Sequence, residues 1–186
     1  MARIPLDTTT ASLQARLVSW GSRRRFGRVT DPVAAWSHHT GVLLTLLHLE
    51  RGVQRWRRLD AGLQALATMA SAARIGCAWC MDFGYWQFHH RGVDPRKLEE
   101  IPQWRSSALY TELERLVLEY AEAMTETPSD VTDEVMARLR QHLDDAAVIE
   151  LTSLVALENM RSRSNAALGL TSQGFKAECE LRPRPV

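Results

Sequence analysis

Two cysteines, Cys77 and Cys80, carry the clearest chemistry in this sequence. Their Cys-x-x-Cys spacing lets the thiols close a small disulfide ring, and residues three apart on a helix face the same way. Gly76 precedes the pair and a helical pattern follows it, so we expect both thiols at a helix N-terminus. The unpaired N–H groups there favour thiolate over thiol, most strongly at Cys77, which is nearer the helix start. A thiolate beside a second thiol is the minimal requirement for thiol redox chemistry.

Two other interpretations of the cysteine pair stay open. A structural zinc ion needs about four ligands, and the sequence has no second Cys-x-x-Cys, while His89 and His90 are adjacent rather than spaced. We therefore predict no metal site. An inert, buried pair is the more serious alternative, because cysteines are commonly buried. The third cysteine, Cys179, lies in a charged C-terminal segment, and the sequence does not assign it a role.

Composition narrows the class of protein and its compartment. The chain has 186 residues and a net charge of +1, which suits one domain and gives no reason to expect a nucleic-acid or membrane partner. The longest apolar stretch, residues 42–49, is too short to span a bilayer. An odd cysteine count with one tight pair is unlike a secreted disulfide framework and favours a reducing, cytoplasmic setting.

Helical periodicity runs through almost the whole sequence, with no alternating strand pattern. The elements that must position the cysteines are therefore helices, and the predicted fold class is all-α. We expect helices over residues 11–20, 33–36, 41–51, 59–75, 77–90, 94–101, 113–124, 135–143 and 146–168, with a basic loop over 21–30. The segment 41–51 has a broad apolar face, which predicts a buried helix.

The residues around the cysteines resemble the carboxymuconolactone decarboxylase family, which includes the alkylhydroperoxidase AhpD-like proteins. The resemblance rests on an alanine-rich segment over 63–67, the run 75–84 that contains the Cys-x-x-Cys, the Gly92-Val93 pair, and later helical segments over 114–127 and 150–169. It covers residues 31–175. We accordingly expect an N-terminal extension over 1–30, with a short helix and the basic loop, an AhpD-like helical domain over 31–175, and a tail over 176–186.

The resemblance implies a helical bundle that assembles into a homo-oligomer, a trimer or hexamer, with a dimer as a further option. In the peroxidase branch of the family the second cysteine attacks a hydroperoxide and the first resolves it. Carried over, Cys80 is the attacking thiol and Cys77 the resolving one. The partners implied are a hydroperoxide substrate and a dithiol reductant protein, with no metal or organic cofactor. Trp79 and Asp82 are the nearby residues expected to support the site.

The sequence departs from the peroxidase pattern at two positions. The pattern places a glutamate twelve residues before the first cysteine, where this chain has Ala65, and a histidine four residues after the second, where it has Gly84. Asp82 lies about 200° around an ideal helix from Cys80, so it points away and could accept hydrogen bonds from another helix. Two alternatives to a peroxidase follow: a lactone decarboxylase-like enzyme, and a non-catalytic oligomeric protein.

Two further groups of side chains have structural interpretations. We expect the aromatic residues near the cysteines to pack in the core or an oligomer interface; they are Trp79, Phe83, Tyr85, Trp86 and Phe88. An apolar substrate pocket is the alternative. Glu158 and Arg161, three residues apart, are expected to form an ion pair at a helix surface or interface.

Overall fold

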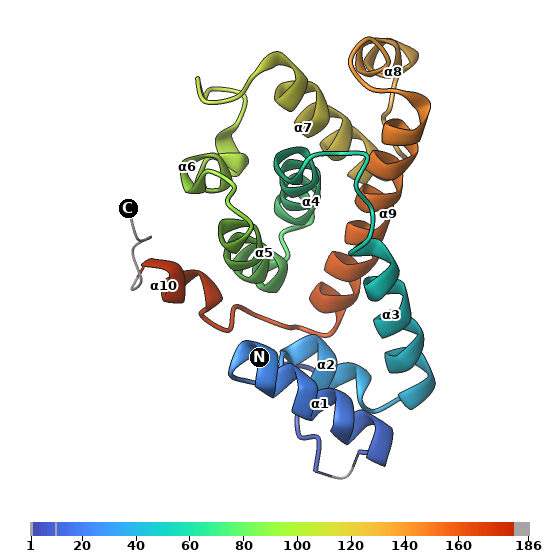
Figure 1. The fold of residues 1–186 in the computed structure, drawn as a ribbon, viewed down its shortest axis with the longest axis vertical. Helices are drawn as coiled ribbons and strands as arrows, with labels where there is room; N and C mark the ends of the chain where they lie inside the picture. Colours follow the sequence, from blue (N-terminus) through green and yellow to red (C-terminus); the bar gives the residue numbers. More distant parts are fainter. Residues whose placement is uncertain (1, 10, 181–186) are drawn as a thin grey trace.

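The computed structural model describes residues 2–9 and 11–180, and these fold into helices without strands (Figure 1). The all-α prediction is confirmed. The helices are α1 (Leu13–Phe26), α2 (Asp31–Trp36), α3 (Thr40–Val53), α4 (Ala61–Ile75), α5 (Ala78–His90), α6 (Pro95–Glu99), η1 (Ile101–Gln103), α7 (Glu112–Thr125), α8 (Asp133–Leu139), α9 (Asp145–Ala167) and α10 (Phe175–Glu180). No helix in the described part of the chain is both long and apolar enough to cross a membrane.

Helix α4 lies at the centre of the bundle, with α5, α7 and α9 packed around it (Figure 1). Its buried face includes the small residues Ala65, Ala67 and Ala70, which let neighbouring helices approach closely. The helix begins where the side chain of Asp60 accepts a hydrogen bond from the Leu63 N–H, at 3.0 Å. It ends at Gly76, whose φ of 78° is a left-handed conformation that suits glycine. That turn delivers the chain directly to Cys77.

The long helix α9 runs beside α4 and α5 and brings residues distant in sequence to the cysteines (Figure 1). Asp144 caps its N-terminus by accepting from the Ala147 N–H at 2.8 Å. Within α9, Glu150 is buried and accepts hydrogen bonds from the Arg58 N–H at 2.8 Å and the Leu59 N–H at 3.2 Å. These bonds fix the loop that leads into α4.

The N-terminal region differs from the prediction in two respects. The helix expected over 11–20 continues to Phe26, so most of the expected basic loop is helical, because arginine is a good helix former and Gly21 does not stop the helix. Gly27, with φ 73°, ends it. Helix α3 is not the buried helix that its apolar face predicted, since Leu43 is its buried residue. The division of the chain at residues 30 and 175 stays a prediction.

The C-terminal segment returns along α5 and ends in α10 (Figure 1). Asp82 holds it there, because its carboxylate accepts hydrogen bonds from the N–H groups of Gln173 at 2.8 Å, Phe175 at 3.1 Å and Lys176 at 2.8 Å. The expectation that Asp82 bonds to another helix is confirmed. Its role here is to anchor the start of α10.

Candidate active site

Cys77 and Cys80 form a disulfide at the start of α5, with their Cα atoms 5.3 Å apart. Cys77 is the N-cap residue, and its sulfur accepts a hydrogen bond from the Cys80 N–H at 3.2 Å. Both residues are buried, with 2% of Cys77 and 7% of Cys80 exposed. The predicted placement of the pair at a helix N-terminus is confirmed. The helix start therefore provides a donor to the Cys77 sulfur.

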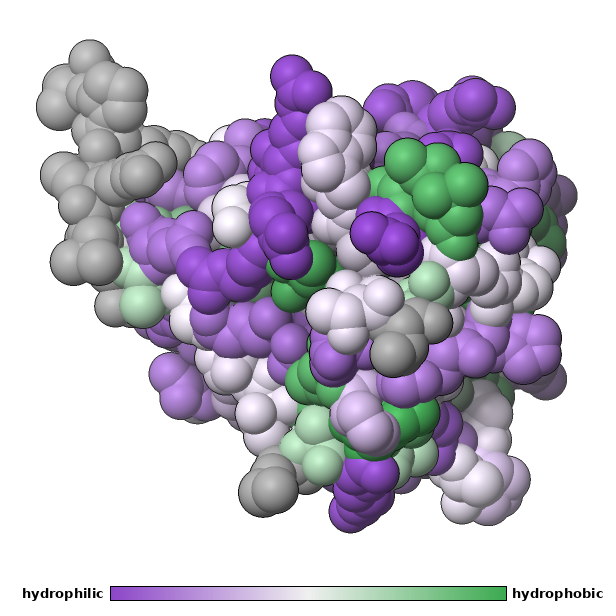
Figure 2. Space-filling view, turned by 90° about the horizontal axis from the view of Figure 1, so that it is seen from below, coloured by the Kyte–Doolittle hydropathy of each residue, from purple (hydrophilic) through white to green (hydrophobic). Residues whose placement is uncertain are grey.

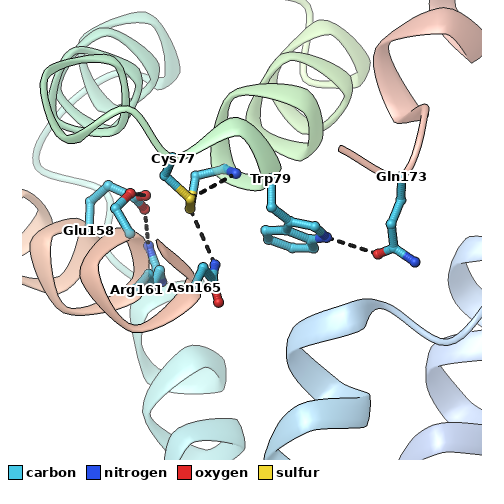
Figure 3. Close-up of a disulfide and its surroundings, with 8 residues drawn as sticks. Cys77, Trp79, Glu158, Arg161, Asn165 and Gln173 are labelled. Atoms are coloured by element: carbon cyan, nitrogen blue, oxygen red, sulfur yellow. Dashed lines mark hydrogen bonds and ion pairs between the residues drawn. A yellow bond between two sulfur atoms is a disulfide. The ribbon is translucent and has the colours of Figure 1, made fainter. Parts of the chain in front are cut away.

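Asn165, on α9, is the polar side chain that contacts the second sulfur. Its Nδ2 donates to the Cys80 Sγ at 3.3 Å (Figure 3). Asn165 is 1% exposed, and its Oδ1 is buried without a hydrogen-bond partner among residues 2–9 and 11–180. A buried amide oxygen normally has a partner, so this one is available to a polar molecule beside the disulfide. The two sulfurs thus have different donors, one from α5 and one from α9.

A buried charged cluster occupies the same face of α9. Glu158 and Asn165 are seven residues apart, nearly two full turns. Figure 3 shows Asn165 reaching the disulfide, with Glu158 and Arg161 beside it on the same helix. Arg161 forms two hydrogen bonds to Glu50, at 2.7 and 2.6 Å, and one to Glu158 at 3.3 Å. Ser162 Oγ donates to Glu158 at 2.6 Å. The expected pairing of Glu158 with Arg161 is confirmed, but Glu158 is buried rather than at the surface.

Burial changes the protonation chemistry of this cluster. It raises the pKa of Glu158 above its ordinary value of 4.5, although the Arg161 charge and the Ser162 hydroxyl act in the opposite direction. Burial lowers the pKa of Arg161, but the charges of Glu50 and Glu158 outweigh it and raise that pKa overall. One guanidinium faces two carboxylates, and burial favours the protonated form of Glu158.

Trp79 and the C-terminal segment are joined beside the disulfide (Figure 3). The indole Nε1 of Trp79 donates to Gln173 Oε1 at 2.8 Å, and the same oxygen accepts from the Asp31 N–H at 2.8 Å. Gln173 in turn is held by Asp82 through its backbone N–H. Asp82 and Trp79 therefore belong to one structural connection, which links the cysteine motif to α2 and α10.

The aromatic residues of α5 form a stacked column, as the packing interpretation predicted. Trp79 stacks on Phe83 with ring centroids 4.8 Å apart, and Phe83 on Trp86 at 5.6 Å. Phe26 from α1 and Phe175 from α10 make edge contacts with Phe83 at 5.4 and 5.2 Å. The column attaches α1 and α10 to α5.

Residues 2–9 cover the disulfide from outside the bundle. Ala2 and Leu6 pack against the cluster of Cys77, Cys80 and Leu170. Arg3 fastens this segment to the end of α9, because its N–H donates to Leu168 O at 2.8 Å and its guanidinium to Ala167 O at 2.7 Å. A molecule that reaches the sulfurs from this side must displace the segment.

A groove of about 560 Å³ lies on another side of α5. Residues of α5 and of the C-terminal segment line it, among them Ala78, Met81, Tyr85, Ser172 and Lys176. Neither cysteine is among its lining residues. The groove is therefore separate from the disulfide, on the part of α5 that faces α6 and α10.

Residues 42–123 match the carboxymuconolactone decarboxylase family. The uncharacterized protein YnjA of Escherichia coli (strain K12) is 33% identical over 158 residues, which cover 84% of this chain and 87% of YnjA. The chain belongs to the carboxymuconolactone decarboxylase family. The resemblance noted from the motif residues is thus confirmed.

Solved structures show that this family member has an AhpD-like fold. An uncharacterized peroxidase-related protein from Ralstonia eutropha JMP134, an alkylhydroperoxidase AhpD core, superposes with a TM-score of 0.82 at 14% identity, over 94% of each chain. The debrominase Bmp8 in complex with 2,3,4-tribromopyrrole gives a TM-score of 0.79 at 18% identity, over 96% of this chain and 97% of Bmp8. At these identities the likeness shows the fold alone.

The structure shows the surroundings of the two positions at which this carboxymuconolactone decarboxylase family member departs from the peroxidase pattern. Ala65 is fully buried in the packed face of α4. At Gly84 an added Cβ would overlap the sulfur of Met69, which is itself buried, so a histidine there requires Met69 to move. The polar groups that lie near the sulfurs come from α9 instead. Neither Asn165 nor Glu158 could be assigned from local sequence, because both reach the site through the packing of α9 on α5.

Proposed function

We propose that the protein is a thiol oxidoreductase that reduces a hydroperoxide through Cys80 and Cys77. The observation that carries the proposal is a Cys-x-x-Cys disulfide at the start of α5 in which each sulfur has its own N–H donor. Hydrogen bonds to a sulfur stabilise its thiolate, which is the nucleophilic form. A purely inert pair does not require a buried amide aimed at one sulfur.

The proposed reaction has two steps. The Cys80 thiolate attacks the terminal oxygen of the hydroperoxide, the O–O bond breaks, and the alkoxide leaves with a proton as an alcohol. Cys80 becomes a sulfenic acid. The Cys77 thiolate then attacks that sulfur, the hydroxyl leaves with a proton as water, and the disulfide forms. An external dithiol protein returns two electrons and two protons to the pair, in a reducing cytoplasm.

Glu158 is the proposed source of the proton for the leaving alkoxide. Its raised pKa favours the protonated form, and it lies on the face of α9 that carries Asn165. Arg161 and Ser162 hold its side chain in place. In this proposal α9 supplies the acid that Ala65 and Gly84 do not.

The test is hydroperoxide consumption driven by dithiothreitol, with mass spectrometry of the cysteines. Cys80→Ser should abolish turnover. Cys77→Ser should leave one attack per chain and a sulfenic acid on Cys80 that dimedone traps. Cys179→Ser, which alters the cysteine outside the pair, is the matched control and should keep the rate. Full activity in a Cys77→Ser/Cys80→Ser double variant would sink the proposal, and a sulfenic acid on Cys77 would reverse the two roles.

A brominated pyrrole is the second electrophile to test, because the debrominase Bmp8 shares this fold. Attack of Cys80 on bromine, followed by attack of Cys77 on that sulfur, would release bromide and leave the pyrrole carbon protonated. The overall electron balance is the same as with a peroxide, since two thiols become one disulfide. Faster disulfide formation with tribromopyrrole than with alkyl hydroperoxides would assign the substrate class to organohalides.

We also propose that the protein works as a homo-oligomer. Large apolar side chains are exposed along one stripe of α1, at Leu13 (71%), Leu17 (60%) and Trp20 (58%). Figure 2 shows apolar side chains at the surface on the side of the molecule where α1 lies. An exposed apolar stripe of this kind supports association with another copy. Analytical sedimentation of the wild type should give the mass of a trimer, hexamer or dimer. Leu17→Glu should reduce the number of copies in that assembly.

A further inference from the structure

A second group of potential ligands lies at the far end of α5, away from the disulfide. His89 and His90 end the helix, and Cys179 from α10 meets them there. One ligand atom from each of the three residues lies within 4.8 Å of the others. Two imidazoles and a thiol in such proximity are a donor set that zinc prefers. The adjacency of the histidines, which argued against a metal in the sequence, is compensated by a third ligand from another helix.

The histidine rings are held in a way that suits metal binding. His90 Nδ1 lies 2.7 Å from the Trp86 carbonyl oxygen, which can only accept, so Nδ1 carries the hydrogen and Nε2 keeps its lone pair. Many metal-binding histidines are oriented by such a second hydrogen bond to a carbonyl. The His90 ring also contacts Trp86 at 4.5 Å, and the His89 ring stacks on Tyr85 at 6.0 Å.

Cys179 is brought to the histidines by the anchoring of α10. Its thiol is buried and lies 3.9 Å from the Phe175 carbonyl, within the same helix. Asp82 fixes the first turn of that helix on α5. The C-terminal end of α5 carries partial negative charge, which favours a cation beside His89 and His90.

We propose that His89, His90 and Cys179 bind a zinc ion, with water in the fourth position of a tetrahedral site. Zinc–nitrogen distances are about 2.0–2.1 Å and zinc–sulfur distances about 2.3 Å. The three ligand atoms, which now lie within 4.8 Å of one another, would therefore move slightly closer together on binding. Binding releases the thiol proton of Cys179 to solvent. The ion would hold the end of α10 on α5 as Asp82 holds its start. The proposal does not depend on the redox role of Cys77 and Cys80.

The test is calorimetric titration of the full chain with zinc chloride, with the Cys77–Cys80 disulfide closed so that this pair offers no thiolate. We expect one zinc per chain. Loss of an outer-shell hydrogen-bond partner typically lowers metal affinity about 10- to 100-fold. Removing a ligand itself should lower zinc affinity by at least that factor. Cys179→Ser and His90→Ala should both show this loss. His142→Ala, which removes an exposed histidine elsewhere, is the matched control and should bind as the wild type does.

Cobalt provides a readout that needs no variant. Cobalt bound at this site should give a thiolate-to-cobalt charge-transfer absorption, and zinc should slow alkylation of Cys179. His90 is exposed, so His90→Ala removes a ligand without disturbing the core. The proposal is overturned if the closed-disulfide protein binds no zinc, if bound cobalt shows no thiolate band, or if zinc affinity survives His90→Ala.

Discussion

The two ends of α5 place cysteine in different chemical surroundings. At the N-terminal end, Cys77 and Cys80 face N–H donors from the helix start and from Asn165, and they are joined to each other. At the C-terminal end, about 15 Å along the axis, Cys179 faces two imidazoles. Hydrogen-bond donors to a sulfur stabilise its thiolate for nucleophilic attack. Imidazole nitrogens beside a thiol instead favour coordination of a metal cation. The chemistry of each thiol therefore depends on its partners across the bundle.

One segment connects these two ends. Leu170 packs in the disulfide cluster, Gln173 bonds to Trp79, and Cys179 reaches the histidines. Asp82, midway between, fixes the segment to α5. The following changes separate the two ends or test the connection between them.

Asn165→Ala acts on the N-terminal end alone and should have the largest effect. It removes the donor to the Cys80 sulfur, and a hydrogen bond to a charged group contributes about 1.5–3 kcal/mol, so peroxide-driven disulfide formation should slow about 10- to 100-fold. Stopped-flow Trp fluorescence or alkylation trapping gives the rate. Asn159→Ala is the matched control. Asn159 also lies on α9, but its side chain donates to Thr125 and to the Val155 carbonyl rather than to a sulfur. Equal slowing in both variants would show that the hydrogen bond from Asn165 to the Cys80 sulfur has no specific role in the reaction.

Asp82→Ala should affect both ends together. The substitution leaves three N–H groups at the start of α10 without their carboxylate, at a cost of about 1.5–3 kcal/mol in the free energy of unfolding. Because α10 carries Cys179, alkylation of this thiol should accelerate and zinc affinity should fall. Urea denaturation and timed alkylation measure the two effects. A variant that loses stability while Cys179 stays protected would show that the ends are independent.

Gly84→Ala tests the middle of α5, where the peroxidase pattern has a histidine. The new Cβ overlaps Met69, and overpacking of this kind costs about 1–3 kcal/mol. Gly52→Ala, in α3, has open space at its Cβ and should instead stabilise by about 0.5–1 kcal/mol. Urea denaturation should therefore show a lower free energy of unfolding for Gly84→Ala and a higher one for Gly52→Ala. Stabilisation by both substitutions would show that Met69 yields readily and that a histidine could be accommodated at position 84.

Glu158→Gln removes the proposed proton donor and should slow turnover, but among these substitutions its effect on stability should be the smallest and should appear in the pH dependence. A raised pKa means that the folded protein binds more protons than the unfolded chain between the ordinary value of 4.5 and the folded pKa. The contribution of Glu158 to stability therefore decreases as pH rises through that window and is constant above it. Gln carries no such proton, so the wild type should lose stability relative to the variant as pH rises from 4.5 to the folded pKa of Glu158. A difference that does not vary with pH would contradict the raised pKa.

Spacing and capping were enough to predict most of the helices and the position of Cys77 and Cys80, because a helix end such as Gly76 acts locally, but they missed α10 and the second half of α1. The partners of the sulfurs were beyond such reasoning, since Asn165 is separated from Cys80 by 85 residues and meets it only through helix packing. Periodicity showed that residues 41–51 have an apolar face, but it could not say whether the chain itself covers that face. The three-residue spacing of Glu158 and Arg161 predicted their pairing and did not reveal that Glu158 is buried and Arg161 half-buried.

Both ends of the described chain lie near cysteine sulfurs, which matters for handling the protein. Residues 2–9 lie over the disulfide, and α10 ends next to His89 and His90. A purification tag joined at the N-terminus would alter how readily reagents reach Cys77 and Cys80. A polyhistidine tag would add imidazoles that compete with His89 and His90 in a zinc titration. Rates and metal stoichiometries should therefore be measured on protein from which any tag has been cleaved.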